Sequence, residues 1–198
     1  MGISASGLEV EVKLRLSTRE EAINRLEGLP AAREGERHLE DNDIYDTPDG
    51  TLRRAEKMLR VRVAAGDVLV TFKEKVHSDL HAKVRREVQT AVGSAEAMRE
   101  ILSMLGLVRV YRYQKYRTYY GWNDPVSGER LAIALDDTPI GTFLELEGPK
   151  QSIDRAARQM GCTEGDYILD DYRTLHLAWL AQRGLPPRDL VFAAETGA

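Results

Sequence analysis

Two short segments of the chain carry paired glutamates at alternate positions, Glu9 with Glu11 and Glu145 with Glu147. Two residues apart on an extended strand, such side chains point to the same face of a sheet. A pair of carboxylates offers the hard oxygen ligands that Mg²⁺ and Mn²⁺ prefer. The spacing therefore predicts a chain that can hold a divalent cation.

Basic residues recur with the same alternation. They are Lys13 and Arg15, Arg60 and Arg62, Lys73, Arg85, and Lys115 and Arg117, with Glu87 and Asp136 at further alternate positions. Arginine binds phosphate through two parallel hydrogen bonds, and lysine supplies a point charge. Carboxylates that hold cations, together with arginines that hold a polyanion, indicate phosphoryl or nucleotidyl transfer on a compact polyphosphate. Positioning and charge neutralisation would drive this chemistry.

The elements that must position these residues are strands. Residues 8–16 alternate strictly between aliphatic and charged side chains, which is typical of a half-buried strand. Similar alternation over residues 59–63, 68–73, 83–89, 110–120, 131–136 and 143–147 predicts a sheet with one charged face. We expect helices after Ser17, Ser94 and Ser152, and a last helix over about residues 166–182, because Ser caps and apolar residues at helical spacing occur there.

The charged face has two interpretations. In an open sheet it would simply be solvated. Three observations favour an inward orientation. The apolar helix stripes must cover the aliphatic faces, the charged face holds few Ser, Thr or Gln residues, and antiparallel strands lose their edges by closing. Since a barrel of about eight strands can hold a small ligand, we expect a barrel. Its charges are tenable only if a cation and a polyanion compensate them.

Two further groups of residues are weaker candidates. His77 and His81 have a spacing that would suit zinc on a helix, but they fall in a polar segment, residues 74–82, that we predict to be a loop. Tyr111, Tyr113 and Tyr119 share a face with two cations and could stack nucleobases. Tyrosine is, however, generally favoured in strands. Neither group predicts a function by itself.

Composition excludes several classes of protein. With 198 residues, 42% of them hydrophobic, the chain is an ordinary globular protein. A net charge of −4 argues against a general nucleic-acid or membrane binder, and no apolar run reaches the roughly 20 residues of a membrane span. The single cysteine, Cys162, fits a reducing cytoplasm. We expect one domain over residues 1–185 and a weakly structured tail over residues 186–198, with a homodimer left open.

The ordered set of motifs resembles the CYTH superfamily, the triphosphate tunnel metalloenzymes. In the family's order these are Glu9-X-Glu11-X-Lys13, Tyr45-Asp46-Thr47, residues 59–62, Thr71-Phe72-Lys73, Arg85-X-Glu87, Lys115-X-Arg117, Leu135-Asp136 and residues 143–147. Within the family, the chain is most similar to bacterial class IV adenylate cyclases. One departure is Lys73-Glu74-Lys75, where relatives often place Gly-Pro after the lysine.

The resemblance implies an α+β fold, an eight-stranded antiparallel tunnel with helices outside. It implies Glu9, Glu11, Asp136, Glu145 and Glu147 as carboxylates of a Mg²⁺ or Mn²⁺ site, and we count Glu87 with them. Lys13, Arg60, Arg62, Lys73, Arg85, Lys115 and Arg117 would cradle the triphosphate, and Glu9, Glu11, Lys13 and Asp136 would act in catalysis.

Three functions remain open at this point. A metal-dependent hydrolase of inorganic, nucleoside or thiamine triphosphate requires the fewest features of the sequence. A class IV adenylate cyclase, which makes cyclic AMP and pyrophosphate from ATP, also needs an adenine pocket. A non-catalytic triphosphate or polyphosphate binder is the third alternative, although both glutamate pairs are intact.

Overall fold

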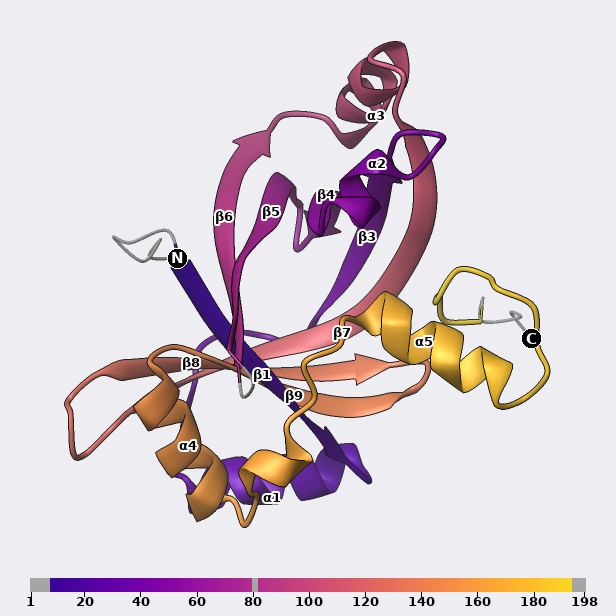
Figure 1. Ribbon diagram of the computed structural model, residues 1–198. Coiled ribbons are helices and arrows are strands. Elements are labelled where there is room, and N and C mark those ends of the chain that lie inside the picture. Colours follow the sequence, from indigo (N-terminus) through magenta and orange to yellow (C-terminus); the bar gives the residue numbers. More distant parts are fainter. Residues whose placement is uncertain (1–7, 80–81, 194–198) are drawn as a thin grey trace.

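A computed structural model describes residues 8–79 and 82–193. Eight strands of this part form a closed antiparallel ring in the order β7-β3-β4-β5-β6-β1-β9-β8, which returns to β7 (Figure 1). Their bounds are β1 Leu8–Leu16, β3 His38–Asp46, β4 Lys57–Ala64, β5 Asp67–Asp79, β6 Ala82–Val92, β7 Val108–Asn123, β8 Arg130–Thr138 and β9 Gly141–Glu147. A short strand β2, Ala32–Arg33, adds to β7. The barrel predicted from the sequence is therefore confirmed.

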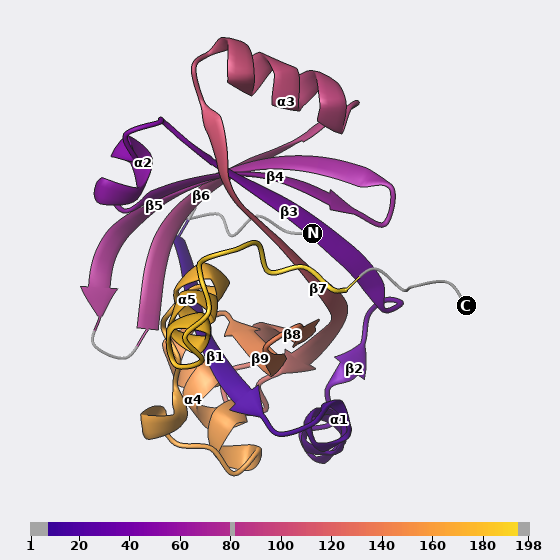
Figure 2. The same cartoon turned by 90° about the vertical axis from the view of Figure 1, so that its right-hand side faces the viewer.

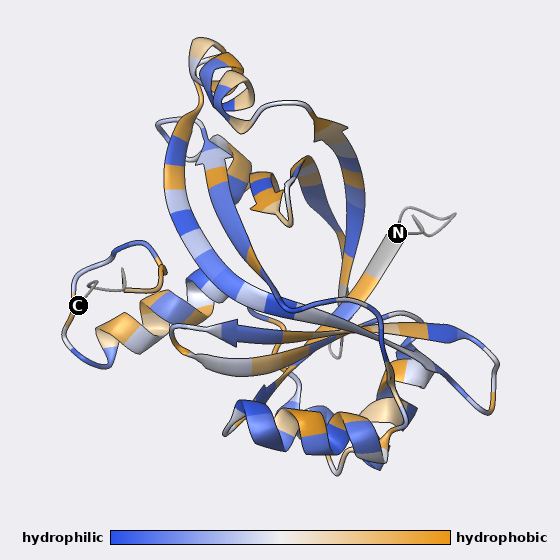
Figure 3. Ribbon diagram, turned by 180° about the vertical axis from the view of Figure 1, so that it is seen from behind, coloured by the Kyte–Doolittle hydropathy of each residue, from blue (hydrophilic) through white to orange (hydrophobic). Residues whose placement is uncertain are grey.

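Alternation along the strands separates the two faces of the barrel. In β1, Val12 and Leu14 point outward into the main apolar cluster, whereas Lys13 between them lines the interior cavity. Figure 3 shows the same change between hydrophilic and hydrophobic residues along neighbouring strands. The charged residues therefore point inward, because the aliphatic face is the one that the helices cover.

Five helices of the described chain lie outside the barrel. Helices α1 (Arg19–Gly28) and α4 (Lys150–Gln159) pack under β1, β8 and β9 through Leu26 and Ile153 (Figure 1). Helix α3 (Ala95–Met104) covers the outer face of β3 and β4 through Leu102 (Figure 2), and the single turn α2 (Thr51–Arg54) lies near it. Helix α5 (Tyr172–Ala181) lies against one opening of the barrel.

The C-terminal part of the chain completes two strand edges of the barrel. On β1, the edge that β6 leaves after Glu11 is taken by Ile168, which exchanges two backbone hydrogen bonds with Lys13 at 2.9 and 3.1 Å. On β7, β8 pairs only from Tyr116 onward. Leu190 takes the earlier part of that edge, donating to Arg112 O at 2.9 Å and accepting from Gln114 N at 2.8 Å.

This pairing corrects one expectation. The segment around Leu190, predicted to be a weakly structured tail, is tied to the barrel, and the Leu190 side chain is buried. The sequence could not predict this contact, because pairing with a strand edge depends on the tertiary structure and not on local propensity. The two prolines before Leu190, Pro186 and Pro187, indicated only that the helix ends.

Several predicted boundaries also differ. Helix α1 is capped by Thr18 and not by Ser17, and α4 begins at Lys150, so Ser152 lies inside the helix and not at its cap. Residues 74–79 were expected in a loop but continue β5 past a bulge between Lys75 and His77, so the departure from the family pattern after Lys73 falls within a strand. The His81 side chain lies outside the described residues, as does that of His77. The last helix begins at Tyr172, capped by Asp171, instead of near Asp166, where a short 3₁₀ turn (Glu164–Asp166) stands. No helix of the described chain is apolar and long enough to span a bilayer.

Candidate active site inside the barrel

A cavity of about 1090 Å³ runs through the barrel, and the inward faces of the strands line it. All seven cations that the sequence predicted as a triphosphate cradle line this one cavity: Lys13, Arg60, Arg62, Lys73, Arg85, Lys115 and Arg117. The predicted carboxylates Glu11, Glu87, Glu145 and Glu147 line it too. Of Glu9 the structure describes the backbone, opposite Arg85, but its side chain lies outside the described part.

Asp136 on β8 anchors two of the cations. The Arg117 guanidinium donates to both of its carboxylate oxygens at 2.6 Å, and Lys115 Nζ donates to Oδ2 at 2.9 Å. The Asp136 side chain is fully buried and does not border the cavity. Both oxygens therefore already accept hydrogen bonds, and Asp136 holds the side chains of Arg117 and Lys115 in place. The metal and catalytic roles of Asp136 stay predictions.

Glu145 on β9 joins this cluster to β1. It forms ion pairs with Arg117 and, at 3.3 Å, with Lys13, which also pairs with Glu11. Burial would raise the pKa of Glu145, but Lys115, Arg117 and Lys13 outweigh it and hold that pKa well below its usual range. For Lys13, burial would lower the pKa, and the two glutamates raise it instead. Both groups therefore keep their charges inside the barrel.

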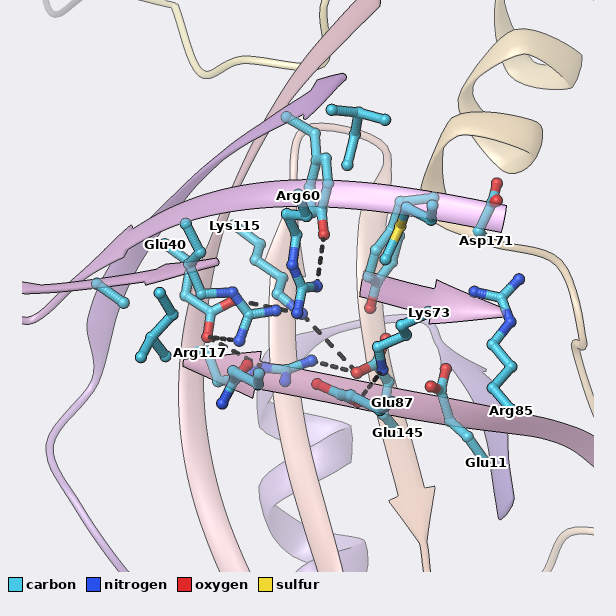
Figure 4. A pocket seen from close by; sticks show the side chains of 18 of the residues that line it. Glu11, Glu40, Arg60, Lys73, Arg85, Glu87, Lys115, Arg117, Glu145 and Asp171 are labelled. Atoms are coloured by element: carbon cyan, nitrogen blue, oxygen red, sulfur yellow. Dashed lines mark hydrogen bonds and ion pairs between the residues drawn. The ribbon is translucent and has the colours of Figure 1, made fainter. Parts of the chain in front are cut away.

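Glu40 on β3 is a buried carboxylate that the sequence analysis missed. Only 1% of its surface is exposed, and it lies 3.1 Å from Arg62, 3.6 Å from Lys115 and 4.0 Å from Arg117 (Figure 4). One of its oxygens, Oε2, accepts no hydrogen bond within the described structure. Glu40 stands in an acidic run, residues 39–43, in which Glu40 and Asn42 alternate as the other inward residues do.

Arg60 on β4 and Arg85 on β6 line the cavity, and each has a buried donor without a partner among the described residues. Arg60 donates to the hydroxyls of Tyr113 at 3.2 Å and Thr71 at 3.4 Å, and neither partner is a carboxylate. The Nε atoms of Arg60 and Arg85 are buried and have no hydrogen-bond partner in the described structure. Because a buried donor without a partner costs free energy, these groups are suited to bind an anion.

The remaining carboxylates form an acidic group on one wall of the cavity. Burial raises the pKa of Glu147; Lys73 opposes this, while Glu11, Glu87 and Glu145 raise it further. Glu87 is 2.7 Å from Lys73. No three acidic, histidine or cysteine side chains in the described chain already converge at metal-ligand positions. Mutually repelling carboxylate oxygens nevertheless match the hard donor set that Mg²⁺ and Mn²⁺ require.

Tyr172 is a second residue that the sequence analysis missed. It enters the cavity from the first turn of α5 and donates from its hydroxyl to Asp136 Oδ2 at 2.7 Å. Lys13 and Lys115 lie 5.5 and 5.2 Å from its ring centroid. Its spacing on a helix is typical of a residue of the apolar core, so no local pattern predicts that Tyr172 contacts the cavity.

Comparison with known proteins places this geometry in a family. The model of the CYTH domain matches residues 7–169. The chain belongs to the CYTH family. A relative from Methanocaldococcus jannaschii, named "Putative adenylate cyclase MJ0240", is 28% identical over 142 residues, 71% of this chain and 76% of that protein.

Solved structures confirm the CYTH fold. A "putative adenylate cyclase" from Vibrio parahaemolyticus superposes with a TM-score of 0.70 at 21% identity, covering 86% of this chain and 98% of that one. A Hippeastrum protein, named a "putative adenylyl cyclase" with "a dominant triphophatase activity", superposes with a TM-score of 0.53 at 17% identity, covering 94% and 92%. At these identities the likeness shows the fold alone.

Proposed function

We propose that this CYTH protein is a divalent-metal-dependent hydrolase of a triphosphate, with inorganic, nucleoside and thiamine triphosphate as the candidate substrates. The observation that carries the proposal is the lining of one cavity by seven cations, two of which have buried Nε donors without partners. A linear triphosphate presents anionic oxygens to several sides, which a ring of cations can match. The sequence further suggests that the enzyme acts in the cytoplasm.

The roles follow from the partners of each side chain. Arg60 and Arg85 would bind phosphate oxygens directly, because arginine matches phosphate with two parallel donors. Arg62 would do so from a position that Glu40 fixes, 3.1 Å away. Lys115 and Arg117 would add charge from fixed positions, since Asp136 and Glu40 hold them. Lys73 and Lys13, each beside a glutamate, would lie between the phosphates and the acidic wall.

The acidic wall would hold Mg²⁺ or Mn²⁺ through Glu11, Glu145 and Glu147, with Glu9 and Glu87 as further ligands. A bound divalent cation supplies charge neutralisation and lowers the pKa of water. Release of Glu11 from Lys13, and of Glu145 from Arg117, would free their oxygens for this purpose. The carboxylates must be ionised to bind the cation, so they couple metal affinity to pH.

A class IV adenylate cyclase is the second candidate, and the name of the Methanocaldococcus relative favours it. The tyrosines that line the cavity, Tyr111, Tyr113 and Tyr119, are the aromatic surface on which an adenine could stack. Hydrolysis remains the proposal because it needs no such base pocket.

A substrate panel tests the proposal. Inorganic triphosphate, ATP and thiamine triphosphate would each be incubated with Mg²⁺ or Mn²⁺, and both phosphate and cyclic AMP would be followed, with Glu11→Gln as the inactive reference. We expect phosphate release that needs the metal and is lost in the variant. Cyclic AMP from ATP would support the cyclase instead, and binding without any turnover would support a non-catalytic binder.

A further inference from the structure

The two ends of the barrel cavity differ in how their surface cations are compensated. Strand β3 runs the length of the cavity, from His38 at one end to Asp46 at the other. At the His38 end, the lining residue Arg130 forms an ion pair with Glu34, which also lines the cavity. This end therefore neutralises its own charge.

At the Asp46 end, three basic residues line the cavity: Arg53 on α2, Lys57 at the start of β4, and Arg173 on α5. In the part of the chain that the structure describes, the side chains of Arg53, Lys57 and Arg173 make no hydrogen bond and no ion pair. The Arg173 guanidinium instead lies 5.6 Å from the ring centroid of Tyr111. This end carries positive charge without a dedicated acidic partner.

Two carboxylates lie at the same end, but both have structural tasks. Asp46 accepts from the backbone amides of Leu52 at 2.8 Å and Arg53 at 3.0 Å, which fixes α2. Asp171 caps α5 by accepting from Thr174 N at 2.8 Å. Asp46 thus holds the turn that presents Arg53, and Asp171 holds the helix that presents Arg173.

The two arginines also repel each other. Burial lowers the pKa of Arg173, and the charge of Arg53 lowers it further, an effect that Asp171 only partly opposes. Two guanidinium groups from separate elements that both line this end of the cavity gain most from an anion placed between them.

We propose that Arg53 and Arg173, assisted by Lys57, form an additional anion subsite at this end of the cavity, and that it binds the further phosphates of a linear polyphosphate longer than three units. The inference rests on the proposed triphosphate site and extends it outward along the same cavity. The substrate class is then inorganic polyphosphate, whose outer units leave the barrel past α2 and α5.

The size of the cavity supports this extension. Its volume of about 1090 Å³ lies above the roughly 300–1000 Å³ of sites that enclose a drug-sized ligand. An uncharged group such as a nucleoside would gain little from two unpaired guanidinium groups, whereas each added phosphate brings a further charge for them to bind.

Chain-length selectivity tests the subsite. Calorimetric titration in Mg²⁺ would compare tripolyphosphate, tetrapolyphosphate and long-chain polyphosphate on the wild type and on Arg53→Gln, Arg173→Gln and the double variant. We expect the Kd of the longer chains to rise at least about tenfold in each variant, and that of tripolyphosphate to change far less. The ratio of the two values within one protein is insensitive to a fraction of misfolded material.

Arg54→Gln is the matched control, because Arg54 lies on the same turn, pairs with Asp49 at 2.7 Å and does not line the cavity. The subsite would be refuted if the arginine variants bound short and long chains with equally increased Kd, or if the Kd of long chains did not change. It would also be refuted if, in a parallel titration, only the Kd of ATP increased. Phosphate release separates the two proposals. A wild type that binds polyphosphate through both arginines but releases no phosphate refutes the hydrolase and keeps the subsite.

Discussion

The hydroxyl of Tyr172 donates a 2.7 Å hydrogen bond to Oδ2 of Asp136, the oxygen that Lys115 and Arg117 also contact. Tyr172 belongs to a helix outside the barrel, yet its hydroxyl completes the group that fixes two interior cations. Burial raises the pKa of Tyr172, and the charges of Asp136 and Glu145 raise it further, so the hydroxyl keeps its proton and remains a donor.

We expect Tyr172→Phe to weaken both stability and triphosphate binding. Loss of a hydrogen bond to a charged group costs about 1.5–3 kcal/mol, and the remaining donors on Asp136 place the expected loss at the lower end. Calorimetry should show a higher Kd for tripolyphosphate, because Lys115 and Arg117 lose part of their anchor.

Tyr167→Phe is a suitable control for this change. Its hydroxyl also donates to an aspartate, Asp154, at 2.8 Å, but neither residue lines the barrel cavity. This control should lose stability and keep its affinity for tripolyphosphate. An unchanged affinity in Tyr172→Phe would refute the positioning role.

Arg60 and Arg117 should respond differently to the same substitution. Arg60→Gln removes bonds to two hydroxyls and to no carboxylate, so we expect the free energy of unfolding to change by less than about 1.5 kcal/mol, while the Kd for tripolyphosphate rises at least about tenfold. Arg117→Gln leaves Asp136 and Glu145 buried with one partner fewer, which should destabilise the protein by about 3–5 kcal/mol. Urea unfolding and calorimetry on both variants would distinguish the two roles, and equal stabilities would contradict them.

Glu40 predicts a pH dependence of stability. Burial would raise its pKa, but Arg62, Lys115 and Arg117 hold that pKa well below the ordinary value. A carboxyl whose pKa is lowered by folding contributes stability above its unfolded pKa of about 4.3, and this contribution is lost as the pH falls toward the folded value. Glu40→Gln should therefore be less stable than the wild type at neutral pH, with a difference that narrows below about pH 4.3. A constant difference in urea unfolding from pH 7 to pH 3 would argue against this account.

Leu190 predicts how strongly the C-terminal segment is held. Its side chain is 1% exposed, between Tyr113 and the residues of α5. Leu190→Ala should cost about 2–5 kcal/mol, as for other buried leucines. Leu185→Ala, at a position 38% exposed, should cost much less. Thermal unfolding of both variants measures the difference, and similar midpoints would mean that the segment does not support the barrel.

Much of this architecture could be predicted from the sequence, because neighbouring side chains of a strand point to opposite faces and the local sequence therefore shows which residues share a face. Strict alternation in residues 8–16 placed Glu11 and Lys13 on one side, and the same alternation assembled all seven cations. The barrel then followed from covering the aliphatic faces and closing the edges.

The missed residues depend on contacts between distant segments. Glu40 stands in an acidic run, and only the pairing of β3 with β4 and β7 makes it a buried partner of cations. Tyr172 has the spacing of a core residue on a helix. Arg53 and Arg173 are 120 residues apart in sequence (positions 53 and 173) and come together only where α2 and α5 meet the cavity.

The pairing of Ile168 with β1 and of Leu190 with β7 has a consequence for biosynthesis. Both contacts complete edges of strands that precede them in the sequence, β1 and β7. During translation the barrel strands leave the ribosome first, while two of their edges still lack partners and Asp136 still lacks Tyr172. The nascent protein can therefore finish its cation-lined interior only when synthesis has passed Leu190, so the proposed activity would begin late in the synthesis of each chain.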